Sequence, residues 1–419
     1  MLSRSDIIDV SPAVVSKLFH ISWIAGAVVW SSPAWAVCTL LATHQSSSHW
    51  CFPCIFAVIF KMLQDTSLAM PARTKSRQCR PSIASMSLGR AAYHSLQHKL
   101  DMAVKYGFEG IELFYEDLET YAQHHCHGSK PEDLLQAAKD VRSLCTARKL
   151  EIVCLQPFMH YEGLRDREEH ARRIEELRLW CKIAHILETD IIGLPSSFLP
   201  KSQITGDFDV LVSDLREVAQ VAAEVKPPIR LAYEALAWGT HVDTWEKAWP
   251  LVEAVDEVNF GLCLDTFNMA GRIYADPAVP TGKTVDADIE VTASCKRLAS
   301  LVNIEKVFFV QVVDGARLKD GPLVEGHKWF DPSQPARMSW SRNARLFYGE
   351  KEQGAYLPIT EILHTYLHEL GYRGWLSQEL FNIEMSNESP DTPERLAARA
   401  EEAWRKMRED LQIPALHTI

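Results

Sequence analysis

The chain has 419 residues, of which 47% are hydrophobic and 24% are charged, as in water-soluble globular proteins. Its 44 basic and 55 acidic side chains give a net charge of −11, which argues against a nucleic-acid partner. The cysteines are scattered and sit mostly within apolar runs, a usage typical of reduced thiols, so we expect a cytoplasmic protein.

Residues 1–75 differ from the rest of the chain, and we expect them to form a poorly structured N-terminal extension. No Lys, Arg, Asp or Glu occurs from Leu18 to Phe60. The stretch Leu18–Ala42 is long enough to span a bilayer and also imitates a secretory signal, but Ser31–Pro33 interrupts it. Its flanks are charge-balanced rather than basic, which disfavours both a membrane anchor and a secretory signal.

Residues 81–411 show a regular alternation of strand-like and helix-like segments. Eight β-rich apolar runs are predicted as strands: Ser82–Met86, Gly110–Phe114, Glu151–Leu155, Asp190–Leu194, Ile229–Tyr233, Phe260–Leu264, Val307–Val310 and Trp375–Gln378. Helical periodicity predicts helices over Leu96–Tyr106, Glu132–Arg148, Arg167–Leu187, Asp209–Val225, Thr244–Val255, Ile289–Leu301, Ile359–Leu370 and Pro393–Leu411. Eight β–α units favour a closed (β/α)₈ TIM barrel over its alternative, a doubly wound sheet.

Polar side chains stand at the ends of the last four predicted strands. They are Glu234, Asp265, Gln311 and Glu379. A single strand-end carboxylate is usually solvated or paired, but the carboxyl ends of adjacent barrel strands meet at one rim. Three carboxylates and an amide oxygen form a ligand set for a hard divalent cation. We therefore predict a site for Mg²⁺ or Mn²⁺, with Co²⁺ as an alternative.

Several longer phrases carry a family resemblance that covers about residues 81–410. They are Ser85–Arg90, Gly107–Phe114, Leu155–Phe158, Tyr233–His241, Gly261–Phe267 and Met338–Arg345. With these phrases the chain resembles the xylose isomerase-like barrels and, among them, the fungal and bacterial 3-dehydroshikimate dehydratases. Many isomerases of this group carry His where this chain has Gln311, and many members carry His where this chain has Asn268.

The resemblance implies a hydro-lyase of quinate and shikimate catabolism that converts 3-dehydroshikimate into protocatechuate and water. A divalent cation on the four predicted ligands would act as a Lewis acid while a base removes a ring proton. A sugar or keto-acid isomerase or epimerase on the same barrel is the alternative enzyme. A metabolite-binding barrel without catalysis is the non-enzymatic alternative. The sequence carries no signal for an oligomeric state.

Two histidines are candidates for acid–base catalysis, because the imidazole pKa lies near the working pH. His241 follows Glu234 by seven residues and is the first candidate, and its alternative role is that of a surface loop residue. His160 follows the third predicted strand and is the second candidate.

Arginines are candidates for holding the substrate carboxylate, because a guanidinium can bind a carboxylate through two hydrogen bonds. Arg345 and Ser341 lie in the long connection between the last two predicted strands, and Arg342 or Arg90 could replace them. Glu112 lies in the second predicted strand, and it could either support the site from behind the ligands or form a structural salt bridge.

Overall fold

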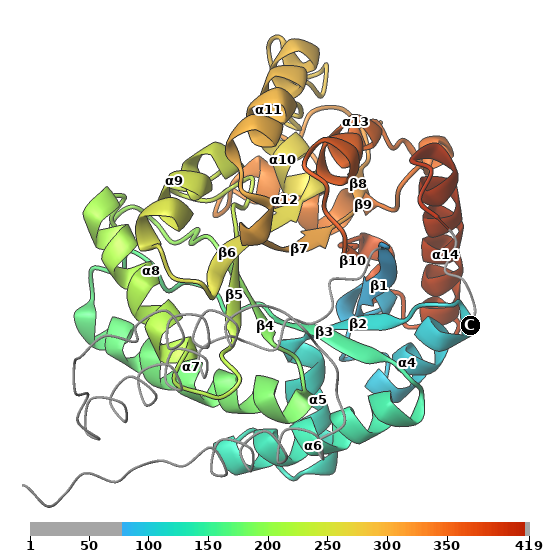
Figure 1. The fold of residues 1–419 in the computed structure, drawn as a ribbon. Helices are drawn as coiled ribbons and strands as arrows, with labels where there is room; N and C mark the ends of the chain where they lie inside the picture. The colour runs from blue at the N-terminus through green and yellow to red at the C-terminus, as the bar shows by residue number, and fades with distance from the viewer. Residues whose placement is uncertain (1–77, 415–419) are drawn as a thin grey trace, which may run out of the picture. The chain divides into compact units, whose positions relative to one another are not determined.

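A closed parallel barrel forms the centre of the computed structural model, which describes residues 78–414 (Figure 1). The strand order around the barrel is β1-β10-β7-β6-β5-β4-β3-β2. The strands are β1 Arg80–Ala84, β2 Gly110–Phe114, β3 Glu151–Gln156, β4 Ile191–Pro195, β5 Arg230–Glu234, β6 Phe260–Asp265, β7 Val307–Gln311 and β10 Trp375–Gln378. The predicted (β/α)₈ fold is therefore confirmed, while the extension predicted for residues 1–75 lies outside the described residues.

The strands hold their polar ends at a common rim. Strands β6 and β7 are buried along their whole length, as expected for parallel strands that are covered on both faces. The pairing places Asp265 opposite Gln311 and Gln311 opposite Ser377, while Glu234 lies opposite Cys263. Carboxylate and amide groups from distant parts of the sequence are therefore neighbours at this rim.

Helices surround the barrel (Figure 1). They are α4 Leu96–Lys105, α5 Tyr115–His125, α6 Pro131–Ala147, α7 Arg167–Leu187, α8 Phe208–Ala222, α9 Trp245–Val255, α10 Thr266–Ile273, α11 Ala287–Leu301, α12 Ala336–Ala344, α13 Ile359–His364 and α14 Thr392–Asp410. Local capping explains several starts, because the side chains of Ser95, Asp166 and Asp207 accept hydrogen bonds from the first turns of α4, α7 and α8.

One helix prediction needs correction, and three helices of the structure were not predicted. The sequence predicted one helix over Ile359–Leu370, but α13 ends at His364 and a π-helical turn follows over Thr365–Glu369. The helices α5, α10 and α12 were not predicted. α10 and α12 have only eight and nine residues, whereas α5 has eleven but begins directly after β2. The other predicted helices agree with the structure to within three residues at each end, and α7 agrees at both ends.

The long connection between β7 and β10 is folded rather than irregular. It contains α12 and a two-stranded antiparallel sheet formed by β8 Asp314–Gly315 and β9 Arg345–Leu346. The Asp314 carboxylate accepts backbone hydrogen bonds from Gly315, Tyr356 and Leu357, and so ties both ends of the connection together. Arg345 thereby starts a defined strand close to the barrel rim. Within residues 78–414, no helix is long and apolar enough to cross a bilayer.

Candidate metal centre and active site

Three buried carboxylates converge at the C-terminal rim of the barrel. Glu234 ends β5, Asp265 ends β6, and Glu379 follows β10 directly. Their exposed fractions are 7%, 3% and 3%, and one oxygen from each lies within 4.8 Å of the others. Carboxylates at this spacing could hold a metal ion.

Asp265 and Asn268 are held by the first turn of α10. Asp265 is the N-cap of this helix, and its Oδ1 accepts a hydrogen bond from the backbone nitrogen of Phe267 at 2.8 Å. One turn later, Asn268 Nδ2 donates to Glu234 Oε1 at 2.6 Å and to Asp265 Oδ2 at 2.7 Å. Asn268 therefore holds two of the three carboxylates in place. Its amide cannot act as a base, as a histidine at this position could.

Arg345 supplies a positive charge to the cluster. Its Nη1 donates to Glu379 Oε2 at 2.8 Å and to Asp265 Oδ2 at 3.1 Å. Its Nε donates to the hydroxyl of Ser341 on α12 at 3.0 Å. The guanidinium also stacks near the rings of Phe267 and Phe381. Arg345 and Ser341, which were both predicted to hold substrate, are thus joined to each other and to the cluster.

Gln311, the fourth predicted ligand, ends β7 beside Asp265 and is 2% exposed. Its Oε1 accepts a hydrogen bond from the thiol of Cys263, and its Nε2 donates to Glu112 Oε1 at 2.7 Å. Gln156 at the end of β3 was missed by sequence reasoning. Its Nε2 donates to Glu112 Oε1 at 2.8 Å and to Glu379 Oε1 at 2.7 Å. The only feature of the sequence that could have indicated Gln156 is its position as a polar residue at the end of a strand.

The electrostatics of the cluster favour a bound cation. Burial raises the pKa of Glu234, Asp265 and Glu379, and the neighbouring carboxylates raise the pKa of Glu234 further. Arg345 opposes this effect, but one guanidinium faces three carboxylates. When all three are ionised, two negative charges remain uncompensated in a buried site. An all-oxygen donor set with this excess charge fits a hard divalent cation.

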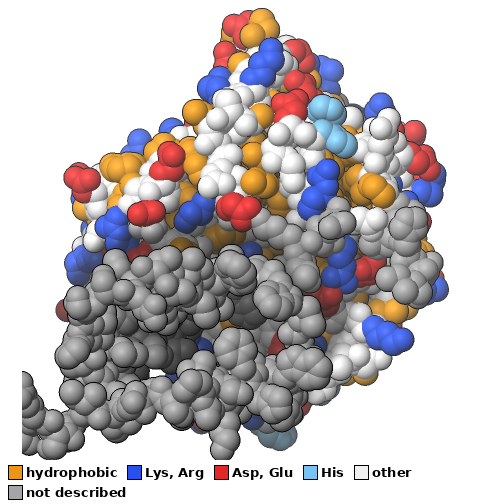
Figure 2. All heavy atoms as spheres, viewed as in Figure 1, with side chains coloured by type: hydrophobic (Ala, Val, Ile, Leu, Met, Phe, Trp, Pro, Cys, Tyr) orange, Lys and Arg blue, Asp and Glu red, His pale blue; other side chains and the backbone are white. Residues whose placement is uncertain are grey.

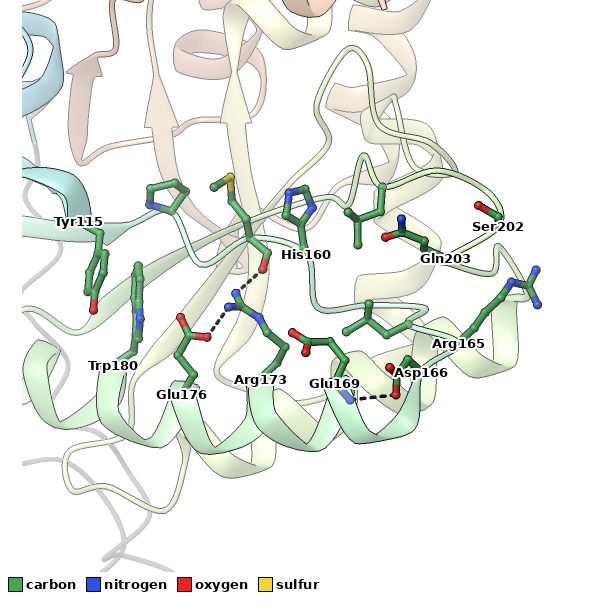
Figure 3. A pocket seen from close by; sticks show the side chains of 14 residues that line it. Tyr115, His160, Arg165, Asp166, Glu169, Arg173, Glu176, Trp180, Ser202 and Gln203 are labelled. Atoms are coloured by element: carbon green, nitrogen blue, oxygen red, sulfur yellow. Dashed lines mark hydrogen bonds and ion pairs between the residues drawn. The ribbon is translucent and has the colours of Figure 1, made fainter. Parts of the chain in front are cut away.

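His160 lines a cavity whose walls include none of the four predicted metal ligands (Figure 3). The cavity has a volume of about 810 Å³ and begins at Pro157, the residue after Gln156. Figure 3 shows His160 among the lining side chains, with Tyr115 and Trp180 stacked at one end. Burial, together with the charge of Arg173, lowers the pKa of His160 to about 4.

His241 packs against the loop that follows β4. A β-carbon added to Gly206 would stand 2.3 Å from His241 Nδ1, so the ring lies directly on that backbone. Burial lowers the pKa of His241, and its Nε2 has no hydrogen-bond partner. Among the described residues, no hydrogen bond or ion pair joins His241 or His160 to the carboxylate cluster, and one ring nitrogen of each is buried without a partner.

Arg90 and Arg342, the other two predicted substrate ligands, lie near each other. Arg342 Nη1 donates to Gln334 Oε1 at 2.8 Å, and the backbone nitrogen of Arg90 donates to the carbonyl of Met385. Burial lowers the pKa of Arg342, and the nearby charge of Arg90 lowers it further. The carboxylate of Asp331 also acts on Arg342 and opposes this lowering, so the charge around Arg342 is mixed.

The barrel and the position of its acidic cluster agree with a family of known proteins. The family model described as "Xylose isomerase-like TIM barrel" matches residues 100–408. The chain belongs to the xylose isomerase-like TIM barrel family. The fold and the superfamily resemblance drawn from the sequence are thereby confirmed.

Individual proteins of known name are similar to this xylose isomerase-like barrel in sequence or structure. The 3-dehydroshikimate dehydratase of Neurospora crassa is 54% identical over 80% of this chain and 94% of its own length, so this chain belongs to the same family. The 3-dehydroshikimate dehydratase of Pseudomonas aeruginosa is 34% identical over 72% of this chain, which spans only 38% of that longer protein. A solved "xylose isomerase-like TIM barrel/4-hydroxyphenylpyruvate dioxygenase fusion protein" is 25% identical over 82% of this chain and 46% of its own, with a TM-score of 0.60.

Glu162 is another buried carboxylate of this xylose isomerase-like barrel. Its environment leads us to predict that the stability of the folded protein depends on pH. Its Oε1 accepts hydrogen bonds from Ser197 N and the Tyr233 hydroxyl, and its Oε2 has no partner. Burial raises the pKa of Glu162 from 4.5 to about 7. The folded state therefore keeps a proton that the unfolded state releases, so stability falls as the pH rises from about 4.5 to about 7.

Glu162→Gln keeps an acceptor for both hydrogen bonds but cannot ionise. Relative to the native chain, we expect the variant to gain up to about 3 kcal/mol of unfolding free energy between pH 4.5 and pH 8. Urea unfolding of both proteins at several pH values measures this difference. Parallel pH profiles for the two proteins would contradict the prediction.

Proposed function

We propose that this chain is a 3-dehydroshikimate dehydratase that eliminates water from 3-dehydroshikimate to give protocatechuate. The observation that carries the proposal is the 54% identity to the Neurospora crassa 3-dehydroshikimate dehydratase over 94% of that protein. The buried cluster of Glu234, Asp265 and Glu379 supports it, because a cation held there would stabilise the negative charge that develops when a proton next to a ketone is removed.

We propose Mg²⁺ or Mn²⁺ as the resident cation, with Co²⁺ as an alternative. Its ligands would be Glu234, Asp265, Glu379 and the oxygen of Gln311, which pairs with Asp265 across β6 and β7. When bound, a divalent cation supplies a Lewis acid that polarises the substrate ketone. Asn268 and Gln156 would keep the carboxylates oriented, since each donates hydrogen bonds to them.

Arg345 is our proposed partner for the substrate carboxylate. It lies beside Asp265 and Glu379 and is oriented by Ser341, so a substrate bound at the cluster would come within reach of its guanidinium. Arg342 and Arg90 stay the alternative partners for the substrate carboxylate, although Arg342 is bonded to Gln334 and Arg90 to Met86. Fixing the carboxylate orients the ring for proton removal and also resists rotation of the substrate.

For the acid–base role we propose His241 ahead of His160. The pKa of His160 is lowered to about 4, which makes its imidazole a weak base near neutral pH. His241 has an unpartnered Nε2 on the loop that follows β5, the strand that carries Glu234. In this role the imidazole would take the ring proton and return a proton to the leaving hydroxyl, which departs as water. Tautomerisation of the remaining ketone to the phenol would then make the ring aromatic.

We propose a cytoplasmic location and a small-molecule substrate as the partner, with no nucleic acid. The cysteines of residues 78–414 are free and buried, as is usual in a reducing compartment. On the described part of the face in Figure 2, Lys and Arg side chains are mixed with Asp and Glu. Such mixing supports the view that this face does not bind a phosphate backbone.

The function is tested by incubating the purified protein with 3-dehydroshikimate and following the absorbance of protocatechuate. We expect product formation that stops after exhaustive chelation and returns when Mg²⁺ or Mn²⁺ is added back, because the carboxylates alone repel the developing charge. Isomerised or epimerised substrate in place of protocatechuate would refute the proposed reaction. Full turnover in metal-free protein would refute the metal.

His241→Asn is expected to lower turnover by on the order of a hundredfold with little change in KM, because a general base acts in the transition state. His160→Asn is the matched control and should retain most of the turnover. Steady-state kinetics on both variants, with the metal content measured in each, distinguishes the two histidines. Near-native turnover of the His241 variant would move the acid–base role to His160.

A further inference from the structure

Glu112 is a completely buried carboxylate that lies behind the proposed metal ligands. It belongs to β2, and its side chain is 0% exposed. Its Oε1 accepts hydrogen bonds from Gln156 Nε2 at 2.8 Å and from Gln311 Nε2 at 2.7 Å, and its Oε2 accepts one from the hydroxyl of Ser377. These partners are neutral, so the structural salt bridge left open by the sequence is not what Glu112 forms.

The chemistry of these contacts fixes the orientation of two amides. The oxygen and nitrogen ends of a glutamine amide are nearly equal in size, so packing alone does not decide which end faces a neighbour. Glu112 Oε1 accepts a hydrogen bond from the NH₂ group of each amide, so both amides turn their nitrogen ends toward Glu112. The carbonyl oxygen of Gln311 then faces away from Glu112, where the thiol of Cys263 donates to it at 3.1 Å.

Orientation decides whether Gln311 can be a ligand at all. A cation binds the amide oxygen and is repelled by the N–H groups at the other end. Gln156 extends the same arrangement, because its Nε2 reaches Glu379 Oε1 at 2.7 Å as well as Glu112. Glu112 on β2 thus orients two amides, that of Gln311 at the end of β7 and that of Gln156, which supports Glu379.

We propose that Glu112 is a positioning residue that turns the Gln311 oxygen toward the cation and holds Gln156 against Glu379. Its acceptor atom performs this function, and its negative charge is secondary. The proposal rests on the metal site proposed above. It explains how a glutamine can serve at a ligand position that needs a defined oxygen.

The test compares Mn²⁺ binding by calorimetry in the full-length native protein, Glu112→Leu and Glu112→Gln. Glu112→Leu removes the acceptor, and we expect its Mn²⁺ affinity to fall about 10- to 100-fold, as for loss of other residues that orient metal ligands. Glu112→Gln can keep its oxygen toward both amides while Ser377 accepts from the new NH₂ group. Its Mn²⁺ affinity should stay within about fivefold of the native value, because the acceptor oxygen is kept. The small expected loss arises because neutral hydrogen bonds are weaker than the charge-assisted ones that they replace.

Glu162→Leu is the matched control, because Glu162 is also buried and accepts hydrogen bonds without contacting the proposed ligands. Its Mn²⁺ affinity should equal that of the native protein. Equal losses in Glu112→Leu and Glu112→Gln would show that the charge matters rather than the orientation, and would overturn the proposal. Native affinity in Glu112→Leu would overturn it too.

Failure of the native protein to bind Mn²⁺ is a different result, because it removes the proposed metal site along with this inference. Should Glu112→Leu fail to fold, Glu112→Met provides a flexible side chain of similar length without a strong acceptor. Thermal unfolding of each metal-free variant identifies the folded ones. The binding comparison is then made on those proteins with the same expected outcomes.

Discussion

Glu379→Gln is expected to lower the bound metal and the turnover together, the turnover by about a hundredfold or more. Glu379 is 3% exposed, and its two oxygens lie next to Gln156 and Arg345. The substitution removes one of three buried negative charges and turns an N–H group toward the site. A divalent cation therefore loses both a ligand and part of the attraction that offsets its dehydration.

Elemental analysis, Mn²⁺ titration and protocatechuate formation on the same preparation measure these effects. Glu388→Gln, the same change at an exposed glutamate, is the matched control and should behave like the native chain. If Glu379→Gln kept its metal but lost turnover, Glu379 would act on the substrate instead. Retention of both would remove Glu379 from the site.

Arg345→Ala should destabilise the metal-free protein by about 3–5 kcal/mol, as expected when one partner of a buried ion pair is removed. Arg345 is 1% exposed, and its guanidinium forms ion pairs with both Asp265 and Glu379. Saturating Mn²⁺ should recover much of this loss, because a bound cation also neutralises those carboxylates. Urea unfolding in chelator and in Mn²⁺ measures both quantities.

Kinetics of the same variant test the proposed contact with the substrate carboxylate. This carboxylate keeps its charge during dehydration, so its loss of a partner should raise KM strongly and lower kcat less. Arg342→Ala is the matched control for stability, because Arg342 is bonded to Gln334 and not to the cluster. Unchanged stability and KM in Arg345→Ala would contradict both roles of Arg345.

Much of the fold was predictable from the sequence because barrel strands and helices leave strong periodic patterns. The helix Arg167–Leu187 was predicted at both ends, since a long amphipathic pattern and a capping aspartate act together. By contrast, α10 has only eight residues, and Asp265 was considered as a strand end rather than as the cap that starts this helix. Local signals therefore sufficed for long elements and failed where one residue has two structural roles.

The candidate site was predictable only in part. Strand ends located Glu234, Asp265, Gln311 and Glu379, because the barrel brings those ends to one rim. The partners of a side chain are set by folding, and no local pattern encodes them. Arg345 was expected to face the substrate, and its contacts with two carboxylates could not be read from its position in the sequence. Gln156 escaped notice for the same reason.

The site also constrains the order of events as the chain is made. Ser377 is 265 residues from Glu112, and Glu379 is 223 residues from Gln156, yet each pair is hydrogen-bonded. The pairing of β1 with β10 must close the barrel before these residues meet. A growing polypeptide on the ribosome consequently lacks the complete cluster until its last strand has emerged. Assembly of the first strands and helices must rely on their own packing, and a cation bound at the cluster would stabilise only the closed barrel.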